Sequence, residues 1–285
     1  MHGKILCAGL VVFFIFMSRS SAGVRDSISA VEQAGGRPAE AIQDNSFLIE
    51  EAYNQEAGVV QHIWNIVEFR THQPGPDLDE WSFVFTQEWP VFSQTHQFSY
   101  TLLYSVADSV NGIGDIALNY RLQALFESET TPAFAPRFSL ILPTGDEEEG
   151  LGNDVFGYQV NLPLSKIVSD RWTVHANAGA TFFPDVDGHD LDSYNVGASA
   201  IYAVSRDFNL MLEALVNWDE EVDDFGGTER TVSAIISPGL RYAFNHPHDA
   251  QTVIGIAAPI GVSDDAPDFG VFLYASFEHF FYRPK

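Results

Sequence analysis

The sequence is almost without cysteine, and its single thiol cannot help to hold the folded protein together. Cys7 lies within residues 1–22, which have a short basic start, an apolar run over residues 5–17 and small side chains at Ser20 and Ala22. This is the pattern of a secretory signal peptide, and we place the cleavage after Ala22. The mature chain then contains no cysteine and depends on packing and hydrogen bonds alone.

Basic residues are also scarce. The chain has 14 Lys and Arg against 39 Asp and Glu. Because Lys4 and Arg19 leave with the signal peptide, the mature chain has 12 bases against 39 acids and a net charge near −27. A chain of this charge repels phosphate groups, which argues against nucleic acid and anionic lipid surfaces as partners.

Long apolar runs and catalytic motifs are missing as well. After residue 22 no apolar run reaches the roughly 20 residues of a membrane-spanning helix. There is no G-x-S-x-G, H-E-x-x-H or phosphate-binding loop, which predicts a protein without enzymatic activity or cofactor. His175 has no evident serine partner in the sequence. A hydrolase built into a barrel is the enzymatic alternative, because triads are defined by geometry rather than sequence order.

The sequence does contain a two-residue periodicity. In residues 171–183, Trp172, Val174 and Ala176 begin an apolar series that alternates with polar residues such as His175 and Asn177. A period of two indicates a strand with two different faces. We predict twelve strands in series, at residues 59–70, 81–89, 96–106, 113–125, 134–142, 155–164, 171–183, 194–204, 208–218, 228–244, 251–262 and 269–282.

These segments are long enough to cross a membrane. A tilted membrane strand needs about 9–11 residues in the hydrocarbon, whereas ordinary globular strands have about 5–6. We therefore predict an all-β protein, an antiparallel up-and-down transmembrane β-barrel of about 12 strands. Its apolar faces would meet lipid, and they include Tyr100, Leu102, Tyr104, Leu118, Tyr120, Val196, Leu212 and Val216.

The connections between the segments point to the same architecture. Those after the second, sixth, eighth and tenth segments are tight, whereas those after the fifth, seventh, ninth and eleventh are acidic. With twelve strands and a periplasmic amino terminus, every acidic connection falls on the outer side. Membrane barrels have short periplasmic turns and longer outer loops, whereas a soluble sandwich has no reason to sort its acids into alternate loops.

Between the signal peptide and the barrel we expect a leader followed by a short helix. We assign residues 23–57 to a leader and a short helix, and residues 58–285 to the barrel. Residues 45–56 begin with a capping residue and place Phe47, Leu48, Ala52 and Tyr53 on roughly one helical face. Such a helix could dock at the periplasmic mouth or in the lumen as a gate, or it could only pack against the first strand.

The polar faces supply candidates for the lining of the lumen. Arginines among few acids could form a selective constriction, or they could pair with the acids and plug a narrow barrel. About eight strands enclose only side chains and 16–18 leave an aqueous channel, so twelve strands are compatible with an open pore and with a closed barrel. The candidates are Asp115, Asn119, Arg121, Arg137, Gln159, His175, Asn177, Glu213 and Arg241.

No metal site is predicted, although one acidic stretch is a weak candidate. Its carboxylates surround a glycine, and hard cations such as calcium bind oxygen clusters of this kind. The ligand set of an EF-hand is incomplete, so a solvated loop is the simpler interpretation. The carboxylates are those of Asp185, Asp187, Asp190 and Asp192.

Two stretches carry a family resemblance. "NSFLIEEAYNQEAGVVQHI" at residues 45–63 and "RFSLILPTGDEEEGLGND" at residues 137–154 are similar to the putative MetA-pathway phenol-degradation family, a group of transporter-like bacterial outer-membrane β-barrels. The resemblance extends from about residue 45 to the end of the chain. It implies a role in the envelope and passage of small compounds, aromatic ones among them, and it brings no catalytic residues.

Three functions fit these observations. The first is an outer-membrane channel for small, aromatic or neutral solutes. The second is a secreted or periplasmic β-barrel binding module, and the third is a structural envelope barrel without transport. We predict the first, in the outer membrane of a Gram-negative cell, with outer-membrane lipid, lipopolysaccharide and small solutes as partners and no nucleic acid.

Overall fold

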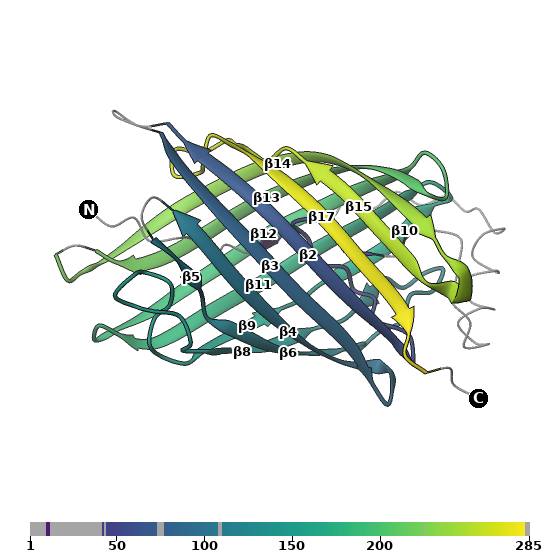
Figure 1. The fold of residues 1–285 in the computed structure, drawn as a ribbon, viewed down its shortest axis with the longest axis horizontal. Coiled ribbons are helices and arrows are strands. Elements are labelled where there is room, and N and C mark those ends of the chain that lie inside the picture. Colours follow the sequence, from purple (N-terminus) through teal and green to yellow (C-terminus); the bar gives the residue numbers. More distant parts are fainter. Residues whose placement is uncertain are drawn as a thin grey trace.

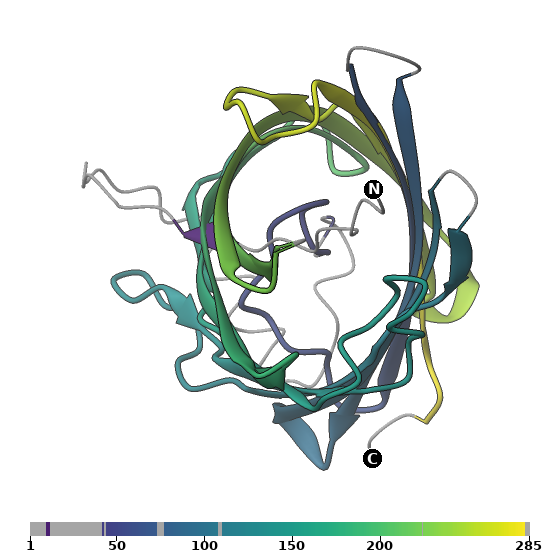
Figure 2. The same cartoon turned by 90° about the vertical axis from the view of Figure 1, so that its left-hand side faces the viewer.

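A computed structural model describes residues 10–11, 42, 44–72, 77–107, 110–223 and 225–282. Twelve antiparallel strands close into one barrel, as predicted (Figures 1 and 2). None of the described helices has the length and apolar character needed to cross a membrane. Apart from residues 10–11, the expected signal peptide lies outside the described residues, and so does nearly all of the leader.

Eight of the twelve strands are continuous. They are β2 (Val59–Thr71), β3 (Leu78–Val91), β4 (Ser93–Ala107), β11 (Trp172–Val186), β12 (His189–Ala203), β13 (Phe208–Val222), β14 (Thr228–Asn245) and β17 (Phe269–Phe280).

The other four strands are each divided into two segments. They are β5 (Val110–Ile113) with β6 (Ile116–Leu122), β7 (Ala133–Phe134) with β8 (Arg137–Leu142), β9 (Gly157–Asn161) with β10 (Leu164–Ser169), and β15 (Gln251–Ala257) with β16 (Ile260–Gly261). Three of the breaks contain a proline, Pro136, Pro163 or Pro259. Proline has no N–H to donate to the ladder, so each break lies where the sequence cannot continue the pairing.

The circuit closes where the last strand meets the first. β17 pairs with β2 from Phe280↔Val59 to Phe269↔Arg70, and every other pairing in the circuit is also antiparallel. Closure leaves no unpaired strand edge. The short strand β1 (Leu10–Val11) makes a parallel pairing with β12 outside this circuit, and one 3-10 turn, η1 (Pro247–Asp249), connects β14 to β15.

The two faces of the strands differ as the alternation predicts. On β13, Leu210 and Leu212 point outward, and the side chain of Leu212 is 53% exposed. Asn209 and Glu213 point into the barrel, where Glu213 is only 1% exposed. Large exposed apolar side chains recur on the outer face of nearly every strand. This is the surface of a barrel whose outside meets lipid.

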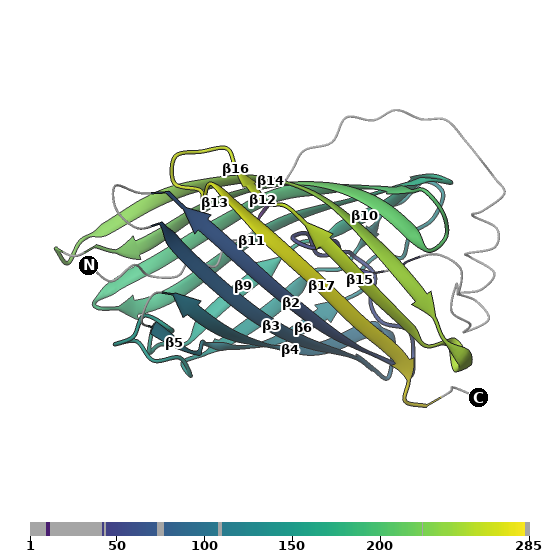
Figure 3. The ribbon, with the colours of Figure 1, turned by 45° about the horizontal axis from the view of Figure 1, so that its top comes forward.

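The hairpins also follow the predicted parity. β11–β12 and β13–β14 turn at the left-hand end in Figures 1 and 3, and β3–β4 and β14–β15 turn at the opposite end. The connection around Gly188 is shorter than expected, because β11 and β12 extend almost to the turn. Asp187 and Gly188 have positive φ angles of 51° and 82°, as a tight two-residue hairpin requires.

The expected helix at residues 45–56 is absent. These residues form an irregular strand-free segment with bends at 47–49 and 52, and it enters the barrel interior (dark blue in Figure 2). The prediction was wrong because helical periodicity assumes that backbone N–H groups bond within the helix. Here the N–H groups of six of these residues bond to side chains of the barrel wall instead.

Candidate functional site

Residues 44–56, which we call the lumen segment, are held inside the barrel by inward-facing side chains. The backbone N–H groups of Leu48 and Ile49 both donate to Oε1 of Glu213, at 3.0 and 3.1 Å. That of Glu50 donates to Oδ1 of Asn177 at 2.9 Å, and Nδ2 of Asn177 donates to the carbonyl of Glu50 at 2.8 Å. The wall therefore replaces the hydrogen bonds that a helix would make with itself.

The second half of the lumen segment is bound in the same way. The N–H of Ala52 donates to Oγ of Ser165 at 2.7 Å. Further donations run from Asn54 to Oε1 of Gln123 at 2.9 Å and from Gln55 to Oε1 of Gln97 at 2.7 Å. Ser165 lies on β10, Gln97 lies on β4 and Gln123 directly follows β6, so the contacts form only when these parts of the wall come together.

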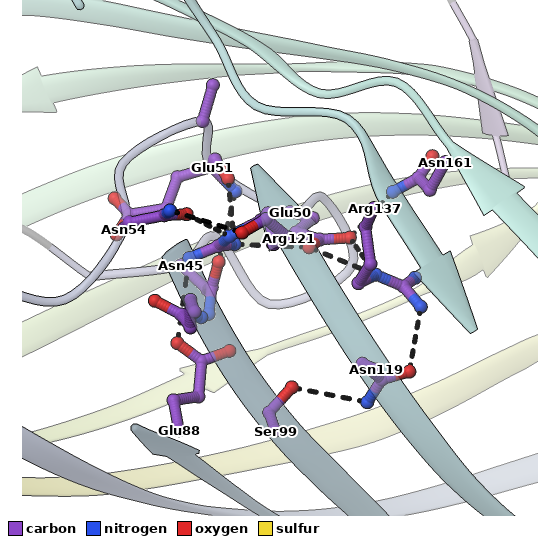
Figure 4. A network of polar contacts seen from close by, with 12 residues as sticks. Asn45, Glu50, Glu51, Asn54, Glu88, Ser99, Asn119, Arg121, Arg137 and Asn161 are labelled. Carbon is purple, nitrogen blue, oxygen red and sulfur yellow. Dashed lines mark hydrogen bonds and ion pairs between the residues drawn. The ribbon is translucent and has the colours of Figure 1, made fainter. Parts of the chain in front are cut away.

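Two arginines meet one carboxylate of the lumen segment (Figure 4). Arg121 on β6 is 2% exposed and donates to Oε1 of Glu50 at 3.1 Å, to the carbonyl of Tyr53 at 2.8 Å and to Oδ1 of Asn54 at 2.8 Å. Arg137 on β8 donates through Nε to both carboxylate oxygens of Glu50, at 3.1 and 2.9 Å. The charge of Glu50 is thus shared between two guanidinium groups.

The other donors of Arg137 are also in use. One terminal nitrogen donates to Oδ1 of Asn119 at 3.1 Å and also to Ser139. The second donates to Oε1 of Gln159 at 3.0 Å. Arg137 faces the lumen, yet four of its five N–H groups already have acceptors in the protein, which leaves it little capacity to bind an anion.

A second anchor holds the start of the lumen segment. Arg241 on β14 donates to the carbonyls of Asp44 and Asn45, both at 2.7 Å. The carboxylate of Asp44 accepts hydrogen bonds from the hydroxyls of Tyr274 and Ser276 on β17. Buried charges are tolerated when they are bonded in this way, and these contacts fix the register of the lumen segment against the wall.

One aromatic side chain of the lumen segment packs closely against the barrel wall. The ring of Phe47 lies 5.5 Å from that of Phe272 and 5.3 Å from that of Tyr274. It covers Gly239 and Gly255, where an added Cβ would lie 2.8 and 2.3 Å from the Phe47 ring. Any larger residue at Gly255 would displace Phe47, so this part of the wall is shaped for the lumen segment.

A cavity of about 560 Å³ lies between the lumen segment and the end of the barrel that carries the loop after β8, the end predicted to face outward. Residues 45–50 line its inner end, and residues 150–152 of the loop after β8 line it near the outer end. Asp115 shapes that loop, because Oδ1 accepts the backbone N–H groups of Thr144 and Gly145, both at 2.9 Å. A cavity of this volume accommodates a small molecule.

The nine predicted lumen residues all lie on the inner face, in two groups. Asp115, Asn119, Arg137, Gln159 and Asn177 line the cavity. The other four are buried against the lumen segment or beside it: Arg121, His175, Glu213 and Arg241.

The structure brings His175 to a serine that sequence order did not suggest. Nδ1 of His175 lies 2.7 Å from Oγ of Ser165 on the neighbouring strand. Both side chains are buried, and the same Oγ accepts the N–H of Ala52. A solute has no access to this pair. The serine and the histidine therefore have a structural role, in which they hold the lumen segment against the wall.

The acidic stretch around Gly188 does not assemble into a metal site. Asp185 and Asp190 face each other near the turn, where the N–H of Asp185 donates to Oδ1 of Asp190 at 3.2 Å. Asp192 pairs with Arg230 at 2.6 Å. Within the part of the chain that the structure describes, no group of three or more His, Cys, Asp or Glu is placed to hold a metal ion.

Sequence reasoning missed the partners on the lumen segment itself. Asp44, Glu50 and Asn54 carry many of its contacts. The signal was present as polar residues within an apolar stretch, but the helical interpretation assigned no partners to them.

Comparison with known proteins agrees with this architecture. Residues 43–277 match the profile of a family described as "Putative MetA-pathway of phenol degradation". An outer membrane channel from Pseudomonas putida F1 superposes with a TM-score of 0.61 at 15% identity, over 84% of this chain and 99% of that one. No curated protein matches the chain.

Two further solved barrels are less similar. The translocator domain of the autotransporter NalP from Neisseria meningitidis gives a TM-score of 0.46 at 12% identity, over 79% of this chain and 89% of that one. The CymD monoaromatic hydrocarbon channel gives 0.38 at 10% identity, over 80% and 90%. The closed barrel and its apolar exterior are those of an outer-membrane protein.

Proposed function

Because the chain belongs to the family described as "Putative MetA-pathway of phenol degradation", we propose that it forms an outer-membrane channel for small solutes, with aromatic and neutral compounds among them. One observation carries this proposal. A closed barrel with a lipid-facing exterior encloses a cavity of about 560 Å³, lined by polar and apolar side chains, near its outer end. Such a cavity is the entrance that a solute would use.

The lumen segment is the gate of this channel. The cavity ends at residues 45–50, and the wall side chains beyond them are buried against the lumen segment. A solute that enters the cavity therefore meets a closed floor. Passage requires the lumen segment to move, and its contacts with Glu213, Asn177 and Ser165 are hydrogen bonds that water can replace.

Single-channel recording in planar bilayers tests the proposal. We expect brief openings from the mature protein and a larger, steady conductance from a variant that lacks residues 45–55. The outer loops are rich in acid, which raises the local concentration of cations, so the current should be cation-selective at low salt. Absence of current from both proteins would contradict the channel.

A second function is favoured by the density of contacts around the lumen segment. A permanently closed barrel would serve the envelope structurally and transport nothing. Conductance only after deletion of residues 45–55, with none from the full mature protein, would select this alternative. We further assign residues 1–22 to a signal peptide and the barrel to a non-enzymatic role, with lipopolysaccharide as a neighbour of the outer loops.

A further inference from the structure

One turn of the barrel has an almost fully exposed phenylalanine at its tip. Phe92 connects β3 to β4, and Val91 and Ser93 on its two sides pair with each other. The side chain of Phe92 is 95% exposed, and its φ angle is 65°. Bulky residues avoid this left-handed region, which glycine adopts without cost. The position therefore combines an unfavourable backbone conformation with an exposed ring, and a ring this exposed gains little packing from the protein in return.

The composition of this turn also differs from that of the other connections at the same end of the barrel. Residues 89–95 read WPVFSQT and contain no charged side chain. The connections after β6, β10, β12 and β14 lie at that end too, and each carries charged residues. These are Glu127 and Glu129, Asp170 and Arg171, Arg206 and Asp207, and Asp249. Charged side chains keep a turn in water, whereas an uncharged turn that exposes a large apolar ring is typical of a contact with another surface.

Aromatic side chains on the neighbouring strands extend the same surface. The ring of Trp89 on β3 lies 5.2 Å from that of Phe281, and the ring of Phe281 lies 4.9 Å from that of Tyr282. Phe281 and Tyr282 directly follow β17 and are 45% and 48% exposed. In Figures 1 and 3 the end of β17 and the β3–β4 turn lie at the same end of the barrel, joined through β2. On this side the apolar exterior thus continues to the end of the strands.

The polar side chains next to these aromatics on the outer face are bonded to one another. Oε1 of Gln87 accepts from Nε1 of Trp89 and from the hydroxyl of Tyr100, both at 3.0 Å. This fixes the orientation of the amide, so Nε2 of Gln87 donates to Nδ1 of His62 at 2.9 Å. Nε2 of His62 in turn lies 3.4 Å from Nε2 of His279. Polar groups in hydrocarbon must find partners within the protein, whereas those in water need not. The network is therefore that of a lipid-covered surface.

From these observations we propose that the β3–β4 turn is inserted in the lipid bilayer, with Phe92 as its membrane anchor. Trp89 precedes Phe92 by three residues, or roughly 10 Å along a strand. With a strand tilt of about 35–45° this is roughly 7–8 Å of depth, close to the thickness of one interfacial layer. The tip then lies among the phospholipid headgroups, where aromatic rings are enriched. The anchor is independent of conductance, because it concerns the exterior and not the lumen.

Spin-label accessibility tests the insertion, since the chain has no cysteine after Cys7. A nitroxide is attached to Phe92→Cys or Phe281→Cys in the mature protein, in phosphatidylcholine nanodiscs that leave both ends of the barrel open to reagents. We expect both labels to collide more often with O₂ than with a water-soluble nickel chelate. Phe225→Cys is the matched control, because Phe225 is 96% exposed at the tip of the acidic β13–β14 hairpin. Ser205→Cys in the charged β12–β13 turn is the control for the same end. Labels at both control positions should show the reverse preference.

The remaining outcomes would each overturn the insertion. A label at Phe92 that prefers the chelate, as at Ser205, would place the turn in water. Few collisions with either reagent would mean that a second copy of the chain, rather than lipid, covers the ring. Heat-sensitive gel mobility shows that each variant is folded. Val91→Cys reports on the same turn from the outer face of β3 and should also prefer O₂, so a folding defect of Phe92→Cys would not leave the proposal untested.

Discussion

Leu212 lies at the middle of the outer face of β13, where its side chain is 53% exposed. We expect Leu212→Arg to reduce assembly, because an arginine facing lipid near mid-depth costs roughly 2–4 kcal/mol. Thr101→Arg is the matched control, since Thr101 lines the cavity on the inner face of β4. The yield of heat-modifiable barrel on gels measures both. Equal loss would mean that the two faces are assigned the wrong way round.

Glu50 is the residue on which two wall arginines depend. Glu50→Gln leaves Arg121 and Arg137 without their shared carboxylate, and removing one partner of a buried pair typically costs about 3–5 kcal/mol. We expect a lower unfolding temperature and a shift of the bilayer reversal potential toward anions, because Arg137 then faces the cavity uncompensated. Glu148→Gln in the exposed outer loop is the control and should change neither value. An unchanged unfolding temperature in Glu50→Gln would show that the pairing contributes little.

At the scale of the element, the lumen segment can be tied to the wall by a disulfide. Oγ of Ser46 lies 2.6 Å from Oγ of Ser199 on β12, and the chain has no cysteine after Cys7. We expect the double variant Ser46→Cys, Ser199→Cys to form a disulfide and to lose its conductance. Reduction should restore the current.

The two single-cysteine variants serve as controls, because neither can cross-link. Both should conduct like the parent protein with and without reductant. Full conductance from the oxidised double variant would contradict a moving gate. The solute path would then pass beside a fixed lumen segment.

At the scale of the whole molecule, strand parity predicts which loops share a side of the membrane. Each strand crosses once, so the loop after β8 and the turn between β12 and β13 lie on opposite sides. We expect a tag inserted at residues 147–148 to be labelled on intact cells. A tag at residues 205–206 should be labelled only after the outer membrane is opened.

Cell fractionation accompanies the labelling experiment. Both tagged proteins should be recovered with the outer membrane and should require detergent for extraction. Recovery in the soluble periplasm would contradict the membrane barrel, and labelling of both tags on intact cells would contradict the parity.

The barrel could be predicted because its causes are local. Two-residue alternation appears within each strand, and Leu212 and Glu213 take opposite faces for that reason alone. Pro136, Pro163 and Pro259 lie in three of the strand breaks, although Pro90, Pro184 and Pro238 lie within continuous strands. Counting the alternating segments then gives twelve strands, and numbering them shows that the acidic connections follow odd-numbered strands.

The lumen segment could not be predicted, because its partners are distant in sequence. Leu48 bonds to Glu213 and Asp44 to Ser276, and each of these partners lies over 160 residues away. Residues 45–56 have a helical apolar pattern, which the closed barrel overrides by offering acceptors to their N–H groups. The pairing of Ser165 with His175 also depends on strand register rather than on spacing.

Amino-acid order by itself therefore determined the strands and their faces, since each depends on neighbours within a few residues. The tertiary structure alone decided that residues 44–56 lie inside the lumen and which polar groups of the wall bond to them. Arg137 is engaged only because the closed wall surrounds a particular path of residues 44–56. Such pairing is a property of three-dimensional proximity, which no sequence period encodes.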